Sequence, residues 1–165
     1  MRRKASPLSE TRLRLDDQLC FSLYAATNAV TRAYRPLLAE VGLTYPQYLV
    51  MLALWQDGAS TIGTLARRLN LPPNALTPLL ARMEEGGLVS RRRDRRDRRV
   101  VRVEPTERGR AIRDRVSRVQ EAVTCRTGLC DSELSALREE LHALARRIES
   151  AGERVEERAA DAALT

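Results

Sequence analysis

The most informative stretch of this chain is SRRRDRRDRRVVRV, residues Ser90–Val103. It contains eight arginines and two aspartates, so its formal charge of +6 accounts for nearly all of the +7 carried by the whole chain. The alternation of arginine and aspartate, between the apolar pair Leu88–Val89 and the valines of residues 100–103, predicts two short strands joined by a polar loop. We therefore expect a β-hairpin with guanidinium groups at its tip, which is typical of the wing that follows a helix-turn-helix.

Length and composition favour a helical protein that binds a polyanion. The 165 residues fit one domain, or one domain with helical extensions. Aromatic residues make up only 4% of the chain while alanine, leucine and arginine are abundant, which favours a mainly helical fold. The pI near 10.1 favours nucleic acid as the partner, and a membrane surface is disfavoured because the basic run is not an amphipathic helix. The alternative is a solvated arginine face without a partner.

The lack of a recognisable targeting signal and the cysteine usage predict a cytoplasmic protein, and we expect no cofactor. No apolar segment of signal-peptide length follows the basic start of the chain, and no later run approaches the ~20 apolar residues of a membrane span. Three cysteines, Cys20, Cys125 and Cys130, are an odd number for a disulfide framework. Their chemistry would therefore be reactive or metal-binding.

The N-terminal part divides into a flexible basic arm, residues 1–15, and a dimerisation and sensor helix, residues 16–45. Asp16 or Asp17 is the expected N-cap of this helix. Pro36 should bend the helix and Gly42 should end it. Cys20 then lies in the first turn, where unpaired amides and the helix macrodipole favour a thiolate.

Residues 46–104 have the pattern of a winged helix-turn-helix. Thr44 would cap a helix from Pro46 to Gln56. Two short amphipathic helices are expected over Thr61–Leu69 and Asn74–Glu85, with a corner at Leu71-Pro72-Pro73 between them. Inward-facing positions are Leu65, Leu69, Leu76, Leu80 and Met83.

The second short helix would be the recognition helix in the major groove. Its outward residues Asn74, Thr77 and Arg82, and also Ala75, are candidates for contact with base edges, because Asn and Arg carry the donors that match adenine and guanine. Pro78 has no N–H for the Asn74 carbonyl, so either the helix starts late or its first turn is distorted.

Two more helices follow the hairpin, over residues 105–150. Pro105 and Thr106 would open a long helix that ends after Val123, and Asp131 or Ser132 would cap a last helix with leucines spaced by three and four. Neither end of the chain has enough neighbours to cover these helices in a monomer, so we expect a homodimer. A charged tail, residues 151–165, would be a helical extension or disordered. The predicted fold is mainly α with a small β-hairpin wing: a winged helix-turn-helix with N- and C-terminal dimerisation helices.

The order of these elements resembles the MarR family of dimeric transcription regulators. The resemblance covers roughly residues 16–150 and rests on the wing motif Asp94–Arg99, followed by Val100 and by Thr106-x-x-Gly109. Three further stretches are similar to the organic-hydroperoxide-sensing, OhrR-like branch of that family: Leu19-Cys20-Phe21-x-Leu23-Tyr24, Ala33-Tyr34-Arg35-Pro36-Leu37-Leu38 and Leu43-Thr44-Tyr45-Pro46-Gln47-Tyr48-Leu49-Val50-Met51.

The resemblance implies a redox switch. Cys20 would be the peroxidatic thiolate, and the hydroxyls of Tyr34 and Tyr45 of the other subunit would orient it, with Tyr24 as a pocket residue. A phenol that donates a hydrogen bond stabilises a thiolate, and peroxide converts the thiolate to a sulfenic acid that a second thiol traps. In two-cysteine members the resolving cysteine belongs to the other subunit, near the end of the helix after the wing. Cys125 matches that position; Cys130 or a small external thiol are the alternatives.

The resemblance also assigns double-stranded operator DNA to the wing. Arg99 would insert into the minor groove while Asp97 orients it. The candidate DNA-binding residues of the hairpin are Arg93, Arg95, Arg96, Asp97, Arg98 and Arg99. This chain departs from the family at the start of the recognition helix, where Pro72-Pro73-Asn74-Ala75 replace small polar residues, so the family's operator sequence does not carry over.

The resulting hypothesis is a dimeric repressor that releases operator DNA when an organic hydroperoxide oxidises Cys20. One alternative is release by a reversibly bound phenolic or aromatic ligand. A second is a thiol peroxidase; it is disfavoured, and we expect no enzyme, because the sole histidine, His142, has no evident carboxylate partner. Simpler alternatives are Cys20 as a core residue and inert Cys125 and Cys130. A zinc site built from the three cysteines and His142 is possible, but its ligand spacing is loose, and no metal is expected.

Overall fold

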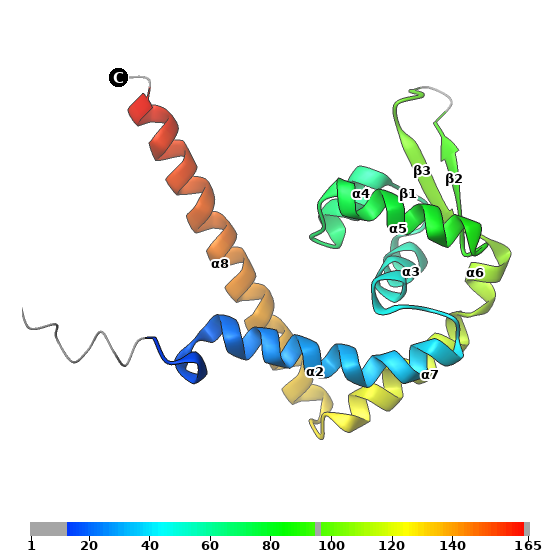
Figure 1. Ribbon diagram of the computed structural model, residues 1–165, viewed down its shortest axis with the longest axis horizontal. Coiled ribbons are helices and arrows are strands. Elements are labelled where there is room, and N and C mark those ends of the chain that lie inside the picture. Colours follow the sequence, from blue (N-terminus) through cyan, green and yellow to red (C-terminus); the bar gives the residue numbers. More distant parts are fainter. Residues whose placement is uncertain (1–12, 95–96, 164–165) are drawn as a thin grey trace, which may run out of the picture. The chain divides into compact units, whose positions relative to one another are not determined.

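The computed structural model describes residues 13–94 and 97–163, with side chains described up to residue 152. The chain divides into two compact units, Met1–Val123 and Thr124–Thr165. It is mostly helical with one small sheet (Figure 1). In chain order the elements are η1 (Leu15–Asp17), α2 (Leu19–Glu40), α3 (Tyr45–Asp57), β1 (Ser60–Thr61), α4 (Ile62–Arg68), α5 (Pro73–Glu85), β2 (Val89–Arg93), β3 (Val101–Pro105), α6 (Glu107–Ala111), α7 (Arg113–Arg126) and α8 (Asp131–Ala163).

The first long helix begins at Leu19, one or two residues later than an aspartate N-cap would place it. Asp16 and Asp17 belong to the 3₁₀ turn η1, and the N-cap of α2 is Gln18, whose backbone is extended. The prediction of an aspartate cap was therefore wrong, because the acidic pair is used in the turn that precedes the helix. α2 continues through Pro36 to Glu40, and Gly42 follows its end with a φ of 76°, as expected for a glycine at a helix C-terminus.

The helix-turn-helix forms as the sequence predicted. The N–H of Thr44 donates to Oε1 of Gln47 at 2.8 Å at the start of α3, and the hydroxyl of Thr61 accepts the N–H of Thr64 at 3.1 Å at the start of α4. α5 begins at Pro73, with Pro78 inside it. The sequence left two options for Pro78, a late start of the helix or a distorted first turn. Because α5 already begins at Pro73, the late start is wrong.

The core of the first unit lies where α3, α4, α5 and the sheet meet. Leu76, Leu80 and Met83 are fully buried and form one stripe on α5, and Leu65 of α4 is 1% exposed. Leu69 is only partly buried. Each fully buried aliphatic side chain contributes on the order of 2 kcal/mol to folding, so this stripe fixes which face of α5 points outward.

The predicted hairpin is present as strands β2 and β3. They pair antiparallel with Arg91 opposite Val103 and Arg93 opposite Val101, and β1 adds to the other edge of β3 in the order β1-β3-β2. Val89 and Val103 point into the core, at 1% and 0% exposure, while Arg92 and Arg102 lie on the opposite face of the hairpin. Because strand side chains alternate with a period of two, Val89 and Val103 anchor the base of the wing in the core. The hairpin extends from there beyond the core (Figure 1).

The helix after the wing is divided into two. Thr106 caps α6 as expected, accepting the N–H of Gly109 at 3.0 Å. The helix then breaks at Ile112, and α7 starts at Arg113, so the prediction of one uninterrupted helix was wrong. Val116, Val119 and Val123 are buried on one face of α7.

The second unit consists of the end of α7 and the 33-residue helix α8. α8 begins at Asp131, so Asp131 and Ser132 do not cap it; Cys130 precedes the helix, and its N–H donates to Oε2 of Glu133 at 2.8 Å. The backbone is helical to Ala163, which agrees with a helical extension of the tail. Leu137, Leu141 and Ile148 are 48%, 43% and 61% exposed, so the apolar stripe of α8 is largely uncovered in one chain.

In the part of the chain that the structure describes, no single helix is long and apolar enough to span a membrane. Only α2 and α3 taken together reach that length and composition, and they are bent by 78° relative to one another.

Candidate functional site

Cys20 is an accessible thiol at the start of α2. It is the second residue of the helix and its side chain is exposed. Leu19 before it and Tyr24 one turn later are 57% and 65% exposed. The alternative in which Cys20 is a core residue is therefore wrong for the single chain. The apolar side chains next to the thiol are exposed as well.

Three tyrosines form a cluster where the end of α2 meets the start of α3. The ring centroid of Tyr34 lies 5.4 Å from that of Tyr45 and 5.1 Å from that of Tyr48, and the other two rings are 5.9 Å apart. Burial, followed by the hydrogen bond and charge of Tyr34, raises the pKa of Tyr48. Burial, then Tyr34, also raises the pKa of Tyr45. Both phenols therefore keep their protons at neutral pH and can donate hydrogen bonds.

Tyr48 is the member of this cluster that sequence reasoning did not assign. It lies on α3 next to the two predicted tyrosines and is 3% exposed. In the sequence it is one of several apolar residues of a buried helix. Its spacing of three from Tyr45, which places both rings on one face, is the signal that could have identified it.

One chain does not bring Cys20 to the tyrosine cluster. Cys20 and Tyr34 are fourteen residues apart on the same helix, which corresponds to about 21 Å along its axis. Of the four tyrosines, only Tyr24, four residues from Cys20, lies on the same face of α2 within one turn of it. Contact of Cys20 with Tyr34 or Tyr45 therefore requires a second copy of the chain.

The two remaining cysteines are also accessible. Cys125 is the next-to-last residue of α7 and Cys130 precedes α8; both are exposed, and Sγ of Cys130 lies 3.1 Å from Oγ of Ser132. Among the described residues no group of three or more metal-ligating side chains is present. The roles of Cys125 and Cys130 in resolving a sulfenic acid stay predictions.

A mainly apolar cavity of about 390 Å³ lies between the end of α2 and the start of α3. It adjoins the tyrosine cluster through Tyr45, and Arg35 supplies its only charged lining group. The lining residues are Thr31, Arg35, Ala39, Leu43, Thr44, Tyr45 and Pro46. Its size and lining fit a small apolar molecule.

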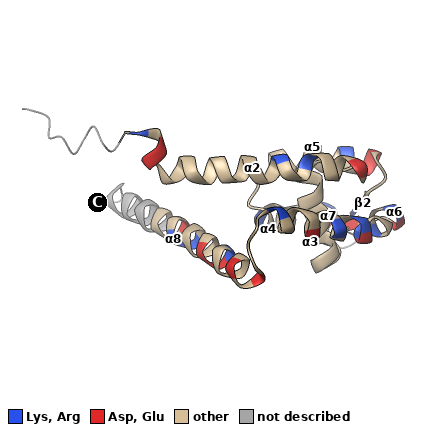
Figure 2. Cartoon of the chain, turned by 90° about the horizontal axis from the view of Figure 1, so that it is seen from below, with Lys and Arg blue, Asp and Glu red and all other residues tan. Residues whose placement is uncertain are grey.

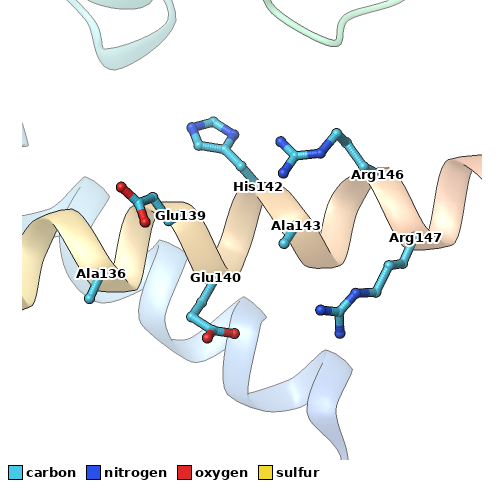
Figure 3. Close-up of a pocket in the computed structure, with 7 residues that line it drawn as sticks. All are labelled: Ala136, Glu139, Glu140, His142, Ala143, Arg146 and Arg147. Carbon is cyan, nitrogen blue, oxygen red and sulfur yellow. The ribbon is translucent and has the colours of Figure 1, made fainter.

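The surface of α8 also carries a hollow, but it has a different character. Its seven lining residues, among them His142, Glu139 and Arg146, all project from this one helix (Figure 3). None of these described lining residues comes from another element, so we assign no ligand to it. Figure 2 shows acidic and basic residues intermixed along α8, in contrast to the arginine-rich wing.

The arginines of the wing fall into two groups. Arg91 is held by Glu84 of α5: its Nη2 lies 2.7 Å from Oε2, its Nε donates to Oε2 at 2.8 Å, and its backbone N–H donates to Oε1 at 2.9 Å. Arg102 donates to Asp94 at 2.8 Å. These two arginines tie the hairpin to α5 and to its own loop, a role that the charge count did not predict.

The described arginines next to the tip of the wing are accessible to a partner. Arg93, Arg98 and Arg99 are exposed, and the side chain of Arg99 is 97% exposed. Oδ1 of Asp97 accepts the N–H of Arg99 at 3.0 Å and lies 3.8 Å from its Nε. This geometry suits the orienting role expected of Asp97, which stays a prediction. Two predicted DNA-binding residues, Arg95 and Arg96, lie outside the described residues.

The pairing of Glu84 with Arg91 predicts a dependence of stability on pH. Hydrogen bonds from the backbone and side chain of Arg91 lower the pKa of Glu84 below 4.5. A carboxyl group whose pKa is lower in the folded state than in the unfolded state stabilises the fold at pH values above its unfolded pKa. This stabilisation is lost as pH falls through the folded pKa. We expect Glu84→Gln to lower the melting temperature at pH 7, and the difference from the parent chain to vanish as pH falls below about 4.5. Thermal melts from pH 3 to pH 7 measure it, with Glu85→Gln as control; a constant difference would contradict the prediction.

Comparison with known proteins places these features in a family. A model of the MarR family matches residues 43–101. The transcriptional regulator TtmR of Methylorubrum extorquens is 44% identical over 138 residues, 79% of this chain and 71% of that protein. The organic hydroperoxide resistance transcriptional regulator of Bacillus subtilis is 41% identical over 103 residues, 62% of this chain and 70% of that protein. Structures of overoxidised and reduced AbfR bound to DNA have TM-scores of 0.68 and 0.69 at 34% identity, covering 85% of this chain and 98% of theirs.

Proposed function

This chain belongs to the MarR family of DNA-binding transcriptional regulators, and from that premise we propose that it is a homodimeric repressor that releases operator DNA when an organic hydroperoxide oxidises Cys20. The observation that carries the proposal is the exposed Cys20 in the first turn of α2, with a tyrosine cluster at the other end of the same helix. A relative named for organic hydroperoxide resistance supports the choice of oxidant.

Dimerisation completes the proposed sensor site. Two copies of α2 packed side by side in opposite directions would bring Cys20 of each chain to Tyr34 and Tyr45 of the other. The exposed apolar residues of α2 and the leucine stripe of α8 supply surface for such an interface. The proposal thus explains why large apolar side chains such as Tyr24 are uncovered in a single chain.

The proposed chemistry has two steps. The thiolate of Cys20 attacks the hydroperoxide, the O–O bond breaks, and the products are a sulfenic acid and, after protonation of the alkoxide, an alcohol. The partner subunit's Cys125 then attacks the sulfenic sulfur, which forms a disulfide and releases water. The phenol groups of Tyr34 and Tyr45 stabilise the thiolate before the first step, because they donate hydrogen bonds to the charged form.

The disulfide would act on DNA through the arrangement of the two subunits. A symmetric dimer binds two half-sites about one helical turn apart. A new covalent link between α2 and the partner's α7 would change the angle between the subunits and move the two recognition helices away from this spacing. A modest rigid-body rotation is sufficient for release.

A second candidate effector is a reversibly bound aromatic molecule. The 390 Å³ cavity between α2 and α3 is the observation that favours it, because its lining is mostly apolar and includes a single cation, Arg35. Release by such a ligand would persist in excess reductant and in a Cys20→Ser protein, which distinguishes it from oxidation.

We expect that cumene hydroperoxide releases the reduced protein from a duplex selected by that protein from a random-sequence library, and that Cys20→Ser abolishes the release. Serine has no thiolate to oxidise, so the variant should bind the duplex but ignore the oxidant. A gel shift measures release, and non-reducing electrophoresis detects the linked dimer. Cys125→Ser should remove the dimer band, whereas the matched control Cys130→Ser should keep it. If Cys20→Ser still dissociates with oxidant, the proposed mechanism is wrong.

A further inference from the structure

The outward face of α5 is apolar at its centre. Leu76, Leu80 and Met83 turn the opposite face into the core, so the 3.6-residue period directs residues 74, 78 and 82 outward together. Asn74 and Arg82 lie one turn on either side of Pro78, and all three are exposed. A polar group at each end therefore frames a patch made of carbon atoms.

The γ-methyl group of Thr77 extends this apolar patch, because the hydroxyl of Thr77 is used by a hydrogen bond within the helix. Its Oγ1 donates to the carbonyl oxygen of Pro73 at 2.9 Å, within the helix. The donor hydrogen is thus used, and the γ-methyl group of Thr77 remains on an exposed side chain. The methyl group of Ala75 is also exposed on this helix.

We propose that this patch, Pro78 with the methyl groups of Ala75 and Thr77 on its two flanks, recognises the 5-methyl groups of thymine in the major groove. The inference rests on the proposed function, in which α5 enters the groove of the operator. Thymine alone among the four bases presents a methyl group there, and alanine and threonine methyls are suited to contact it. The flanking Asn74 matches adenine, so the central part of each half-site would contain A·T pairs.

Replacing thymine with uracil tests this directly, since it removes the methyl group and keeps every hydrogen-bonding group. The probe is the duplex selected by the reduced protein, with deoxyuridine in place of thymidine in one half-site. We expect affinity to fall roughly fourfold for each contacted methyl group. The same replacement in the flanks outside both half-sites should leave affinity unchanged.

Two variants of Thr77 assign the effect to the patch. Thr77→Ser keeps the hydroxyl that bonds Pro73 and removes the methyl group, so its preference for thymine over uracil should fall roughly fourfold at one position. Thr77→Val keeps the methyl group and loses the hydroxyl, and should retain the preference. Pro78→Ala, which restores a backbone donor to the helix, should also lower the preference.

The outcomes separate this inference from the proposed function. Tight binding with equal affinity for the thymine and uracil duplexes overturns methyl recognition and leaves DNA binding intact. Loss of the preference in Thr77→Val but not in Thr77→Ser would overturn the assignment to the methyl group. Failure to select any duplex would instead contradict the proposed function itself.

Discussion

Replacing Gly109 with alanine is expected to lower the free energy of unfolding by about 3 kcal/mol. A Cβ atom at this position would overlap the carbonyl oxygen of Leu88 and lie 3.1 Å from Cε of Met51. The backbone around it has little room to move, because the carbonyl of Gly109 accepts Nε1–H of Trp55 at 3.0 Å and its N–H donates to Thr106 at 3.0 Å. Overpacking against backbone atoms cannot be relieved by a change of rotamer.

Thermal or urea unfolding at one fixed protein concentration measures this effect, and a fall of about 10 °C in melting temperature is expected for a chain of this size. Gly63→Ala is the matched control. Gly63 lies in α4, and the nearest atom to its added Cβ would be a flexible arginine nitrogen at 3.8 Å. That variant should be neutral or up to ~1 kcal/mol more stable. Equal melting temperatures for the two variants would contradict the close approach at Leu88.

The same region shows how far the sequence predicts structure. The motif Thr106-x-x-Gly109 was visible as a family resemblance and as a helix cap. Its full role depends on contacts with distant residues: the Thr106 hydroxyl donates to the carbonyl of Gly87 at 2.6 Å, and Gly109 packs on Leu88. The cap follows from local spacing, whereas the packing of a helix start against the end of α5 depends on tertiary structure. At the break itself, Ala111–Arg113, no proline or glycine interrupts the helical pattern.

The candidate site also contains features that the local sequence predicts and features that depend on tertiary contacts. Cys20, Tyr34 and Tyr45 could be named from motifs, and the hairpin from its alternation of charge. Tyr48 and Glu84 could not, because each acts through a contact between elements: Tyr48 with Tyr34 of α2, and Glu84 with Arg91 of β2. Formal charge counts arginines equally, but only the fold distinguishes those held closely by a carboxylate, such as Arg91, from those whose side chains stay exposed, such as Arg99.

That distinction leads to the second large effect, which concerns Arg99. In a homodimer, Arg99→Ala removes two exposed guanidinium groups that we propose to lie on DNA. Each such contact releases about 0.9 counterion, so the slope of log affinity against log salt should become less steep by about 1.8. The same relation gives a loss of affinity of roughly 60-fold at 0.1 M salt. Binding titrations of the selected duplex across a salt series measure both quantities.

Arg91→Ala provides the matched comparison, because it removes the same charge from the same hairpin. Its guanidinium group is 2.7 Å from the carboxylate of Glu84, so it is neutralised within the protein and has no counterion on DNA to displace. We expect Arg91→Ala to lower the melting temperature while the salt slope stays near that of the parent chain. An equal change of slope in both variants would mean that net charge alone governs binding. A change confined to Arg99→Ala would mean that binding depends on which arginines the fold leaves exposed, as it does the 97% exposed side chain of Arg99.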